Sequence, residues 1–337
     1  MTTDRSPSLV HRALMDAAER RHRFAGGDVR AWQRELRARL RELTGYERMP
    51  QEPPALDVQR LWLRDGVEKL TFCAEEHASV PAYLMLPEGT PPFATMLCLQ
   101  GHSTGMHNSV ALDAESESHA IEVEGARDFA RQCVAQGYAA LCIEQRAFGE
   151  RRELQQAHVN RYNPCHDAAM HALALGRTLL AERVYDVARA LDFVSTRAEL
   201  DDTRVGVMGN SGGGTVAIWA GALLERIAFV MPSCSLCTFR HSLMSVYHCS
   251  DNYIPGILQV AEMADVAGLI APRPLLAVTG AKDALFPLEG VRQCFDELHA
   301  VYRALGAATR AELIVGSEGH RFYPELAWPR ALELFPP

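Results

Sequence analysis

The chain has 337 residues, of which 48% are hydrophobic and 23% charged, a composition that excludes disordered, collagen-like and coiled-coil chains. No stretch approaches the roughly 18 to 20 apolar residues of a membrane-spanning helix, and the first residues contain no apolar signal core. The formal net charge of −8 argues against a nucleic-acid partner. We therefore expect a cytoplasmic protein that binds neither nucleic acid nor membrane.

Nine cysteines are spread through apolar segments, where a reduced thiol serves as a small hydrophobic side chain. Their odd number and placement argue against a disulfide scaffold.

Residues 8–44 show the apolar periodicity of two amphipathic helices, separated at Gly26 and Gly27. Residues 1–50 carry eleven arginines interleaved with seven acidic residues, so we expect these helices to pack on the body of the protein or on a second subunit of a homo-oligomer. The interpretation is an N-terminal helical extension over 1–50, followed by a linker at 51–54.

The remaining chain, 56–337, is predicted to form one catalytic domain of α/β class. Short alternating segments indicate an antiparallel section at 56–63, 69–74 and 80–86. Continuous apolar runs indicate buried parallel strands at 94–99, 138–143, 205–208, 227–231, 275–278 and 312–315. Helical patterns lie between them at 122–136, 173–196, 215–224, 288–305 and 323–334. This order predicts a mostly parallel central sheet with helices on both faces.

The strongest chemical motif is G-x-S-x-G, formed by Gly209, Ser211 and Gly213 between a predicted strand and a predicted helix. Such a turn exposes a serine hydroxyl, and the glycines are needed because strand and helix nearly touch beside it. The free N–H groups at the start of the helix face the place where negative charge would develop. The motif predicts that Ser211 is a catalytic nucleophile.

A nucleophilic serine needs a histidine base and a carboxylate that orients it. Asp283 follows the strand at 275–278, and His320 follows the strand at 312–315. Parallel strands place such residues together at the carboxyl edge of the sheet. The order Ser211, Asp283, His320 predicts a catalytic triad.

Three other residues compete for these roles and are set aside. Asp265 resembles the cap of a short helix, His299 lies inside a predicted helix, and Glu318 falls outside the expected chain order.

The oxyanion hole requires two backbone N–H donors. The first is predicted to be Gly212, directly after the nucleophile. The second is predicted to be His102, in the loop that follows the strand at 94–99. The side chain of His102 is expected to be a polar wall of the site rather than a catalyst.

On these motifs the chain resembles the α/β-hydrolase superfamily, and within it the dienelactone hydrolase and acetyl xylan esterase-like group. The matching segments are 99–102, 144–150, 176–180 with Asp186, 209–214, 251–256, 270–275, 280–283, 286–287 and 319–320. The resemblance implies a carboxylic ester hydrolase without metal or cofactor, in which Ser211 is acylated, His320 is the base and Asp283 orients it. One departure is Gln100, where members of the group usually carry histidine.

Cys234, Cys237 and His241, or His248 with Cys249, could be zinc ligands or a redox pair. We expect instead that a segment after the strand at 227–231 shapes the substrate pocket. The residues predicted to do so are Cys234, Phe239, His248 and Tyr253.

Glu144 and Arg146 are expected to form a buried ion pair that braces the loops near the site.

The sequence therefore predicts a serine esterase for a small acyl ester, such as an acetylated sugar, or for a lactone. Two alternatives stay open. The same triad could serve an exopeptidase or amidase, or the chain could be a catalytically silent binding protein with a hydrolase fold.

Overall fold

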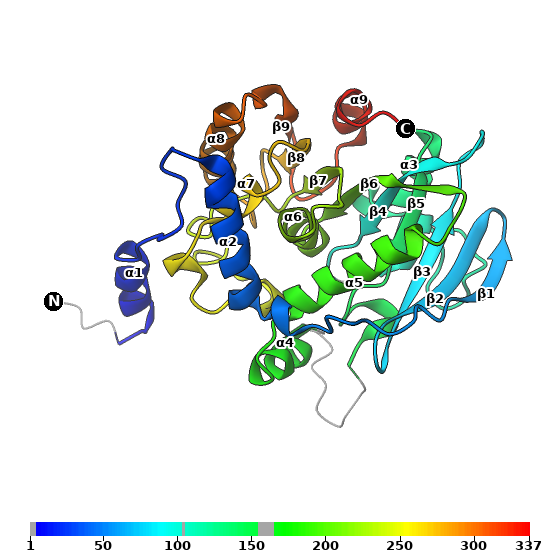
Figure 1. The fold of residues 1–337 in the computed structure, drawn as a ribbon, viewed down its shortest axis with the longest axis horizontal. Helices are drawn as coiled ribbons and strands as arrows, with labels where there is room; N and C mark the ends of the chain where they lie inside the picture. Colours follow the sequence, from blue (N-terminus) through cyan, green and yellow to red (C-terminus); the bar gives the residue numbers. More distant parts are fainter. Residues whose placement is uncertain (1–4, 103–104, 154–164) are drawn as a thin grey trace.

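The computed structural model describes residues 5–102, 105–153 and 165–337. Its centre is a nine-stranded sheet in the order β1-β2-β3-β5-β4-β6-β7-β8-β9 (Figure 1). The strands are β1 (Gln59–Arg64), β2 (Val67–Glu75), β3 (Ala78–Met85), β4 (Phe93–Leu99), β5 (Ala139–Ile143), β6 (Leu200–Asn210), β7 (Phe229–Ser233), β8 (Leu275–Gly280) and β9 (Ala311–Gly316). The pairs β1–β2, β2–β3 and β3–β5 are antiparallel, and all other pairs are parallel.

Helices cover both faces of the sheet. They are α1 (Ser8–Asp16), α2 (Val29–Thr44), α3 (Phe129–Ala135), α4 (Cys165–Ala174), α5 (Leu179–Val194), α6 (Gly212–Leu223), α7 (Met263–Gly268), α8 (Leu288–Ala304) and α9 (Pro324–Leu334). Successive β4 residues point to opposite faces, with Leu97 and Leu99 in one core and Met96 and Cys98 in the other. Helices α2, α5, α6, α7 and α8 enclose the first core, and α3 and α9 enclose the second. Burial on both faces explains the continuous apolar runs of the parallel strands.

The α/β class, the mostly parallel sheet and its antiparallel start are confirmed. The strands fall within a few residues of their predicted positions because their apolar runs are uninterrupted.

Two predicted helices are wrong in their N-terminal parts. Only 129–135 of the predicted helix 122–136 is α-helical, since Gly125 takes a left-handed φ of 69° in the preceding segment. The predicted helix 173–196 is divided between α4 and α5, because Gly176 has a φ of 79°. Thr178 then caps α5 by accepting a hydrogen bond from the N–H of Ala181 at 3.1 Å.

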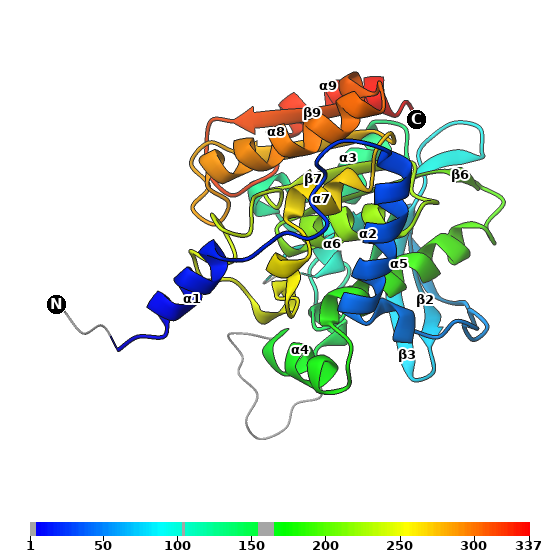
Figure 2. The same ribbon diagram turned by 60° about the vertical axis from the view of Figure 1, so that its left-hand side comes forward.

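The two N-terminal helices differ in how they pack. Helix α2 lies against the body, and its Leu36 and Leu40 are fully buried in the same core as α5 and α6. Helix α1 projects at the periphery, as Figures 1 and 2 show, and none of its residues is buried. The helical extension predicted over 1–50 thus contains one helix that belongs to the main core.

Across the described ranges no helix has both the length and the hydropathy needed to cross a membrane. All nine cysteines fall within the described ranges, and none is in a disulfide bond.

Candidate active site

Ser211 lies in the turn that joins β6 to α6, with φ of 56° and ψ of −124°. A positive φ is costly for a residue with a side chain, and it persists where surrounding contacts impose it. The Ser211 N–H donates to the carbonyl of Ser233 at 2.9 Å, which ties the turn to the end of β7. The turn thereby leaves Ser211 at the carboxyl edge of the sheet.

The glycines of the motif allow β6 and α6 to approach closely. A methyl group on Gly209 would lie 2.5 Å from the carbonyl group of Gly213, and one on Gly213 would overlap the carbonyl oxygen of Leu99. Side chains at either position would force the helix away from the strand.

Asp283 and His320 are brought together at the same edge, in the loops after β8 and β9. His320 Nδ1 lies 2.7 Å from Asp283 Oδ2, with the aspartate side chain fully buried and the histidine 27% exposed. The second carboxylate oxygen accepts hydrogen bonds from the N–H groups of Leu285 at 2.9 Å and Phe286 at 3.2 Å. Since Nδ1 faces the carboxylate, Nε2 is the nitrogen left for proton exchange.

Asp283 is held in its charged form. Burial alone would raise the pKa of Asp283, but the hydrogen bond and charge of His320 and the two backbone donors lower it below its ordinary value. The ring of Phe286 stacks on His320 with 5.9 Å between centroids and fixes the plane of the imidazole. The imidazole is therefore oriented, and the aspartate is ionised.

The loop after β4 contacts the nucleophile turn. A methyl group on Gly101 would lie 3.1 Å from Ser211 Cβ, and one on Gly212 would lie 2.7 Å from His102 Cε1. Gln100 anchors this loop from the other side by donating to Ser109 Oγ at 2.6 Å. The predicted oxyanion donors Gly212 and His102 thus lie in the two segments that meet beside Ser211, whereas residues 103 and 104 of the loop lie outside the described residues.

The His102 side chain belongs to a network that the sequence did not predict. His102 Nε2 lies 3.1 Å from Asp251 Oδ2, and Asp251 also accepts a hydrogen bond from the fully buried Arg183. Burial opposes the charged form of His102, but Asp251 outweighs it and raises the pKa of His102 to about 9. Burial likewise opposes the charge of Asp251, yet Arg183 and His102 lower its pKa. The sequence points to Asp251 only through segment 251–256, which resembles the family, and no local pattern indicates a role for Arg183.

The four residues predicted to line the substrate pocket do not all lie around one cavity. Phe239 and His248 line a small cavity beside Phe286, together with Thr215 and Trp219. His248 lies edge-on to Phe286 at 5.2 Å, so this cavity adjoins the ring that stacks on His320.

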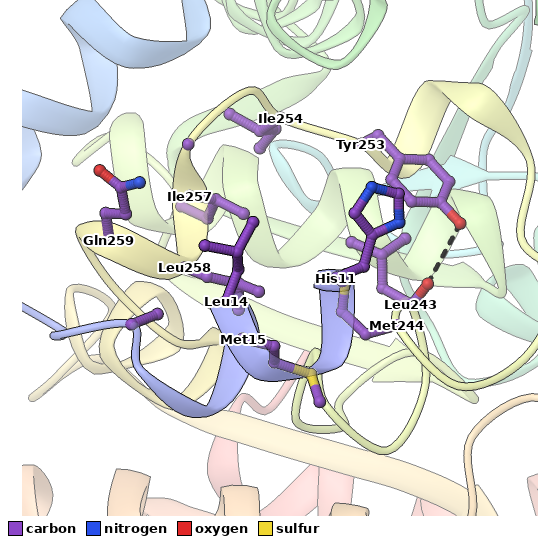
Figure 3. Close-up of a pocket in the computed structure, with 12 residues that line it drawn as sticks. His11, Leu14, Met15, Leu243, Met244, Tyr253, Ile254, Ile257, Leu258 and Gln259 are labelled. Carbon is purple, nitrogen blue, oxygen red and sulfur yellow. Dashed lines mark hydrogen bonds between the residues drawn. The ribbon is translucent and has the colours of Figure 1, made fainter. Parts of the chain in front are cut away.

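Cys234 and Tyr253 lie elsewhere. Cys234 is fully buried beneath the site, and its Sγ lies 3.3 Å from the carbonyl oxygen of Arg321. Burial and then the charge of Asp283 raise the pKa of the Cys234 thiol to about 12, so it stays protonated. Tyr253 lines a different, apolar pocket against α1, where its hydroxyl donates to the carbonyl of Leu243 at 3.1 Å (Figure 3).

The pocket in Figure 3 is formed by His11, Leu14 and Met15 of α1 against the segment 243–259. It contains none of Ser211, Asp283 and His320, nor the Phe286 ring that stacks on His320.

The expected ion pair between Glu144 and Arg146 is not formed. Glu144 accepts from the N–H groups of Met106 at 3.2 Å and Glu150 at 3.3 Å, whereas Arg146 binds Asp186 at 2.9 Å. Both residues lie beyond the end of β5, where the chain turns at Arg146 and Ala147, so the two side chains brace different loops. Burial raises the pKa of Glu144 to about 7.

The competing residues do not take part in the Asp283–His320 hydrogen bond, although Glu318 lies close to it and pairs with Lys282 at 3.1 Å. Asp265 helps to cap the short helix α7, as expected, because its carboxylate accepts from the N–H of the N-cap residue Glu262 at 2.9 Å. The same carboxylate pairs with Arg20 at 2.7 Å. His299 lies inside α8, and Glu318 is exposed.

Potential metal ligands gather in two groups within the part of the chain that the structure describes. One contains Cys234, Asp283 and His320, and the other contains His102, Cys165, Cys249 and Asp251. Cys237 and His241, which the sequence grouped with Cys234, belong to neither group.

The fold and the strand–turn–helix at Ser211 define an α/β-hydrolase. Residues 6–298 match the model of the Abhydrolase family, and the chain belongs to that family. The family confirms the resemblance to the α/β-hydrolase superfamily that the sequence motifs indicated.

Individual relatives are named as hydrolases or esterases. YtaP of Bacillus subtilis (strain 168), named as a hydrolase, is 28% identical over 263 residues, covering 75% of this chain and 82% of that protein. A Bacteroides fragilis protein assigned as an acetyl xylan esterase superposes with a TM-score of 0.76 at 19% identity, covering 93% of this chain and 82% of the other. A glucuronoyl esterase from Solibacter usitatus gives a TM-score of 0.63 at 17% identity, covering 90% of each chain.

Proposed function

We propose that the protein is a serine carboxylic ester hydrolase that acts on a small acyl ester through an acyl-enzyme. The observation that carries the proposal is the position of Ser211, in a positive-φ turn at the sheet edge that also holds the Asp283–His320 hydrogen bond. The names of the relatives, which include carbohydrate esterases, support ester hydrolysis.

In the proposed reaction, His320 Nε2 removes the proton from Ser211 Oγ as the oxygen attacks the ester carbonyl. Backbone N–H groups of Gly212 and His102 stabilise the oxyanion. His320 then gives its proton to the leaving alcohol, and a water molecule activated by the same nitrogen hydrolyses the acyl-serine. Asp283 stays ionised and stabilises the imidazolium.

The size of the cavity beside the Phe286 ring supports a small acyl group. Thr215, one helical turn after Ser211, lines this cavity together with Trp219. Its volume is about 20 Å³, roughly that of one ordered water molecule. An acetyl methyl group is the acyl chain that best matches this space, in an acetylated sugar or a related ester.

The test compares nitrophenyl acetate, butyrate and octanoate with the matching acetyl anilide. We expect the acetate ester to be hydrolysed fastest, because the small cavity matches an acetyl methyl group. We expect the anilide to be hydrolysed far more slowly, because an anilide is a much poorer leaving group than nitrophenolate. Ser211→Ala should lose about 10³-fold or more of the activity. Ser195→Ala serves as the matched control and should retain the activity, because Ser195 ends α5 before β6 begins, whereas Ser211 follows the other end of that strand.

Equal rates on ester and anilide would favour the amidase alternative. Absence of hydrolysis of every ester by folded protein would favour a silent binding protein.

A further inference from the structure

Two cysteines from distant parts of the chain meet behind the oxyanion loop. Cys165 is the first residue of α4, and Cys249 directly precedes the short helix η5 (Ser250–Asn252). Their Sγ atoms, one ring nitrogen of His102 and a carboxylate oxygen of Asp251 all lie within 4.8 Å of one another. The proposed ester hydrolysis uses neither thiol.

Cationic groups face this sulfur pair. Arg183 Nη2 donates to Cys165 Sγ at 3.3 Å, and the same guanidinium binds Asp251. The imidazole of His102 also interacts with Cys165. Fully buried positive charge beside a sulfur atom favours the thiolate, the reactive form of cysteine.

The two sulfurs share a hydrogen bond, and this contact is the largest cause that lowers the pKa of Cys165, to about 5. Burial opposes the shift, and the charge of Arg183 adds to it. The same contact raises the pKa of Cys249. The Arg183 contact thus favours Cys165 as the thiolate, with the Cys249 sulfur beside it.

The charges also argue against a metal ion at this cluster. Thiolate, imidazole and carboxylate are suitable ligands for zinc. However, the Arg183 guanidinium already donates to both Asp251 and Cys165, and a divalent ion placed among these atoms would meet that positive charge at close range.

We propose that Cys165 and Cys249 form a redox-active dithiol that a small hydroperoxide converts to a disulfide. The geometry needs only a local movement, since the Sγ atoms start within 4.8 Å and close to about 2.05 Å in a disulfide. Cys165 is fully buried and Cys249 is half-buried, so an oxidant of the size of hydrogen peroxide is the appropriate class.

The reaction balances in two steps. The thiolate attacks one peroxide oxygen, which breaks the O–O bond, forms a sulfenic acid and releases hydroxide. The second thiol then attacks the sulfenic sulfur, forms the S–S bond and releases water, with its own proton leaving on the oxygen. The two sulfurs together lose two electrons to the peroxide, and a dithiol reductant returns them.

The protein contains its own matched control. Cys98 and Cys133 lie 3.8 Å apart between sulfurs, but both are buried in an apolar core. Burial raises the pKa of Cys98 far above its ordinary value, so Cys98 stays protonated. Proximity alone would oxidise both pairs, whereas our proposal requires oxidation of the first pair only.

The experiment exposes the intact, reduced protein to hydrogen peroxide, blocks remaining thiols by alkylation, and maps peptides without reduction. We expect one cross-linked peptide that joins Cys165 to Cys249, no link between Cys98 and Cys133, and complete reversal by dithiothreitol. In Cys249→Ser the link should vanish and Cys165 should gain oxygen instead. This readout is independent of ester hydrolysis, so it stands or falls separately from the proposed function.

Alkylation of Cys165 and Cys249 at unchanged yield after peroxide would overturn the proposal, and so would equal linking of the Cys98–Cys133 pair. One equivalent of zinc copurifying with the chain and protecting both thiols would also overturn it, in favour of a metal site. If Cys249→Ser does not fold, the peptide map of the unaltered protein decides alone.

Discussion

At the scale of single residues, the candidate site depends on charges whose partners are fixed. Asp283 is buried, yet its two oxygens together receive His320 and two backbone N–H groups, so its charge is fully compensated. The sequence predicted this pair because each residue follows a buried parallel strand. It did not predict the Asp251–Arg183 contact behind His102, because no spacing along the chain brings these residues together.

Asp283→Asn tests the orienting role. The amide keeps the shape of the side chain but favours the wrong tautomer of His320, so we expect kcat/KM for acetate esters to fall by about 10²- to 10³-fold with little change in KM. Steady-state kinetics measures the effect. A loss below about threefold would remove Asp283 from the proposed mechanism.

Glu144→Gln tests the buried carboxyl beneath the oxyanion loop. Burial raises the pKa of Glu144 from 4.5 to about 7, so its neutral form is favoured on folding. Its stabilising contribution is present below about pH 4.5 and is lost as the pH rises through about 7. The glutamine variant should therefore gain stability relative to the unaltered protein between pH 5 and pH 8, by up to about 3 kcal/mol.

Urea unfolding of both proteins at pH 5 and pH 8 measures this difference. A difference in unfolding free energy that is the same at both pH values would show that Glu144 titrates normally.

At the scale of elements, helix ends were less predictable than strands. Apolar runs identify the buried strands, but Gly125 and Gly176 end or interrupt helices through left-handed backbone that an apolar pattern does not reveal. The N-terminal helices show the same limit. Both are amphipathic in sequence, yet α2 is buried in the core and α1 is not.

Leu36→Ala and Leu9→Ala together test whether α2 and α1 differ in how much they contribute to stability. Leu36 is fully buried in α2, and its truncation should lower the free energy of unfolding by about 2 to 5 kcal/mol. Leu9 in α1 is 50% exposed, and its truncation should change stability by less than about 0.5 kcal/mol. Chemical denaturation gives both values, and equal losses would contradict the packing of the two helices.

At the scale of the whole molecule, parallel strands concentrate chemistry at one edge. Strands β4, β6, β8 and β9 end there, and the segments that follow them hold His102, Ser211, Asp283 and His320. Alternating strand and helix patterns predict a mostly parallel sheet, which explains why the fold class was predictable, but they do not give the position of β5 between β3 and β4. The substrate pocket was less predictable, since Phe239 and His248 share one cavity, whereas Cys234 is buried beneath the site and Tyr253 lines another pocket.

The most direct test of the account is labelling with a fluorophosphonate probe, followed by intact-mass measurement and peptide mapping. A single adduct on Ser211, absent from Ser211→Ala and strongly reduced in His320→Ala, is the predicted result, because only an activated serine reacts at a useful rate. Folded protein that remains unlabelled, or that carries the adduct on another residue, would contradict Ser211 as the nucleophile.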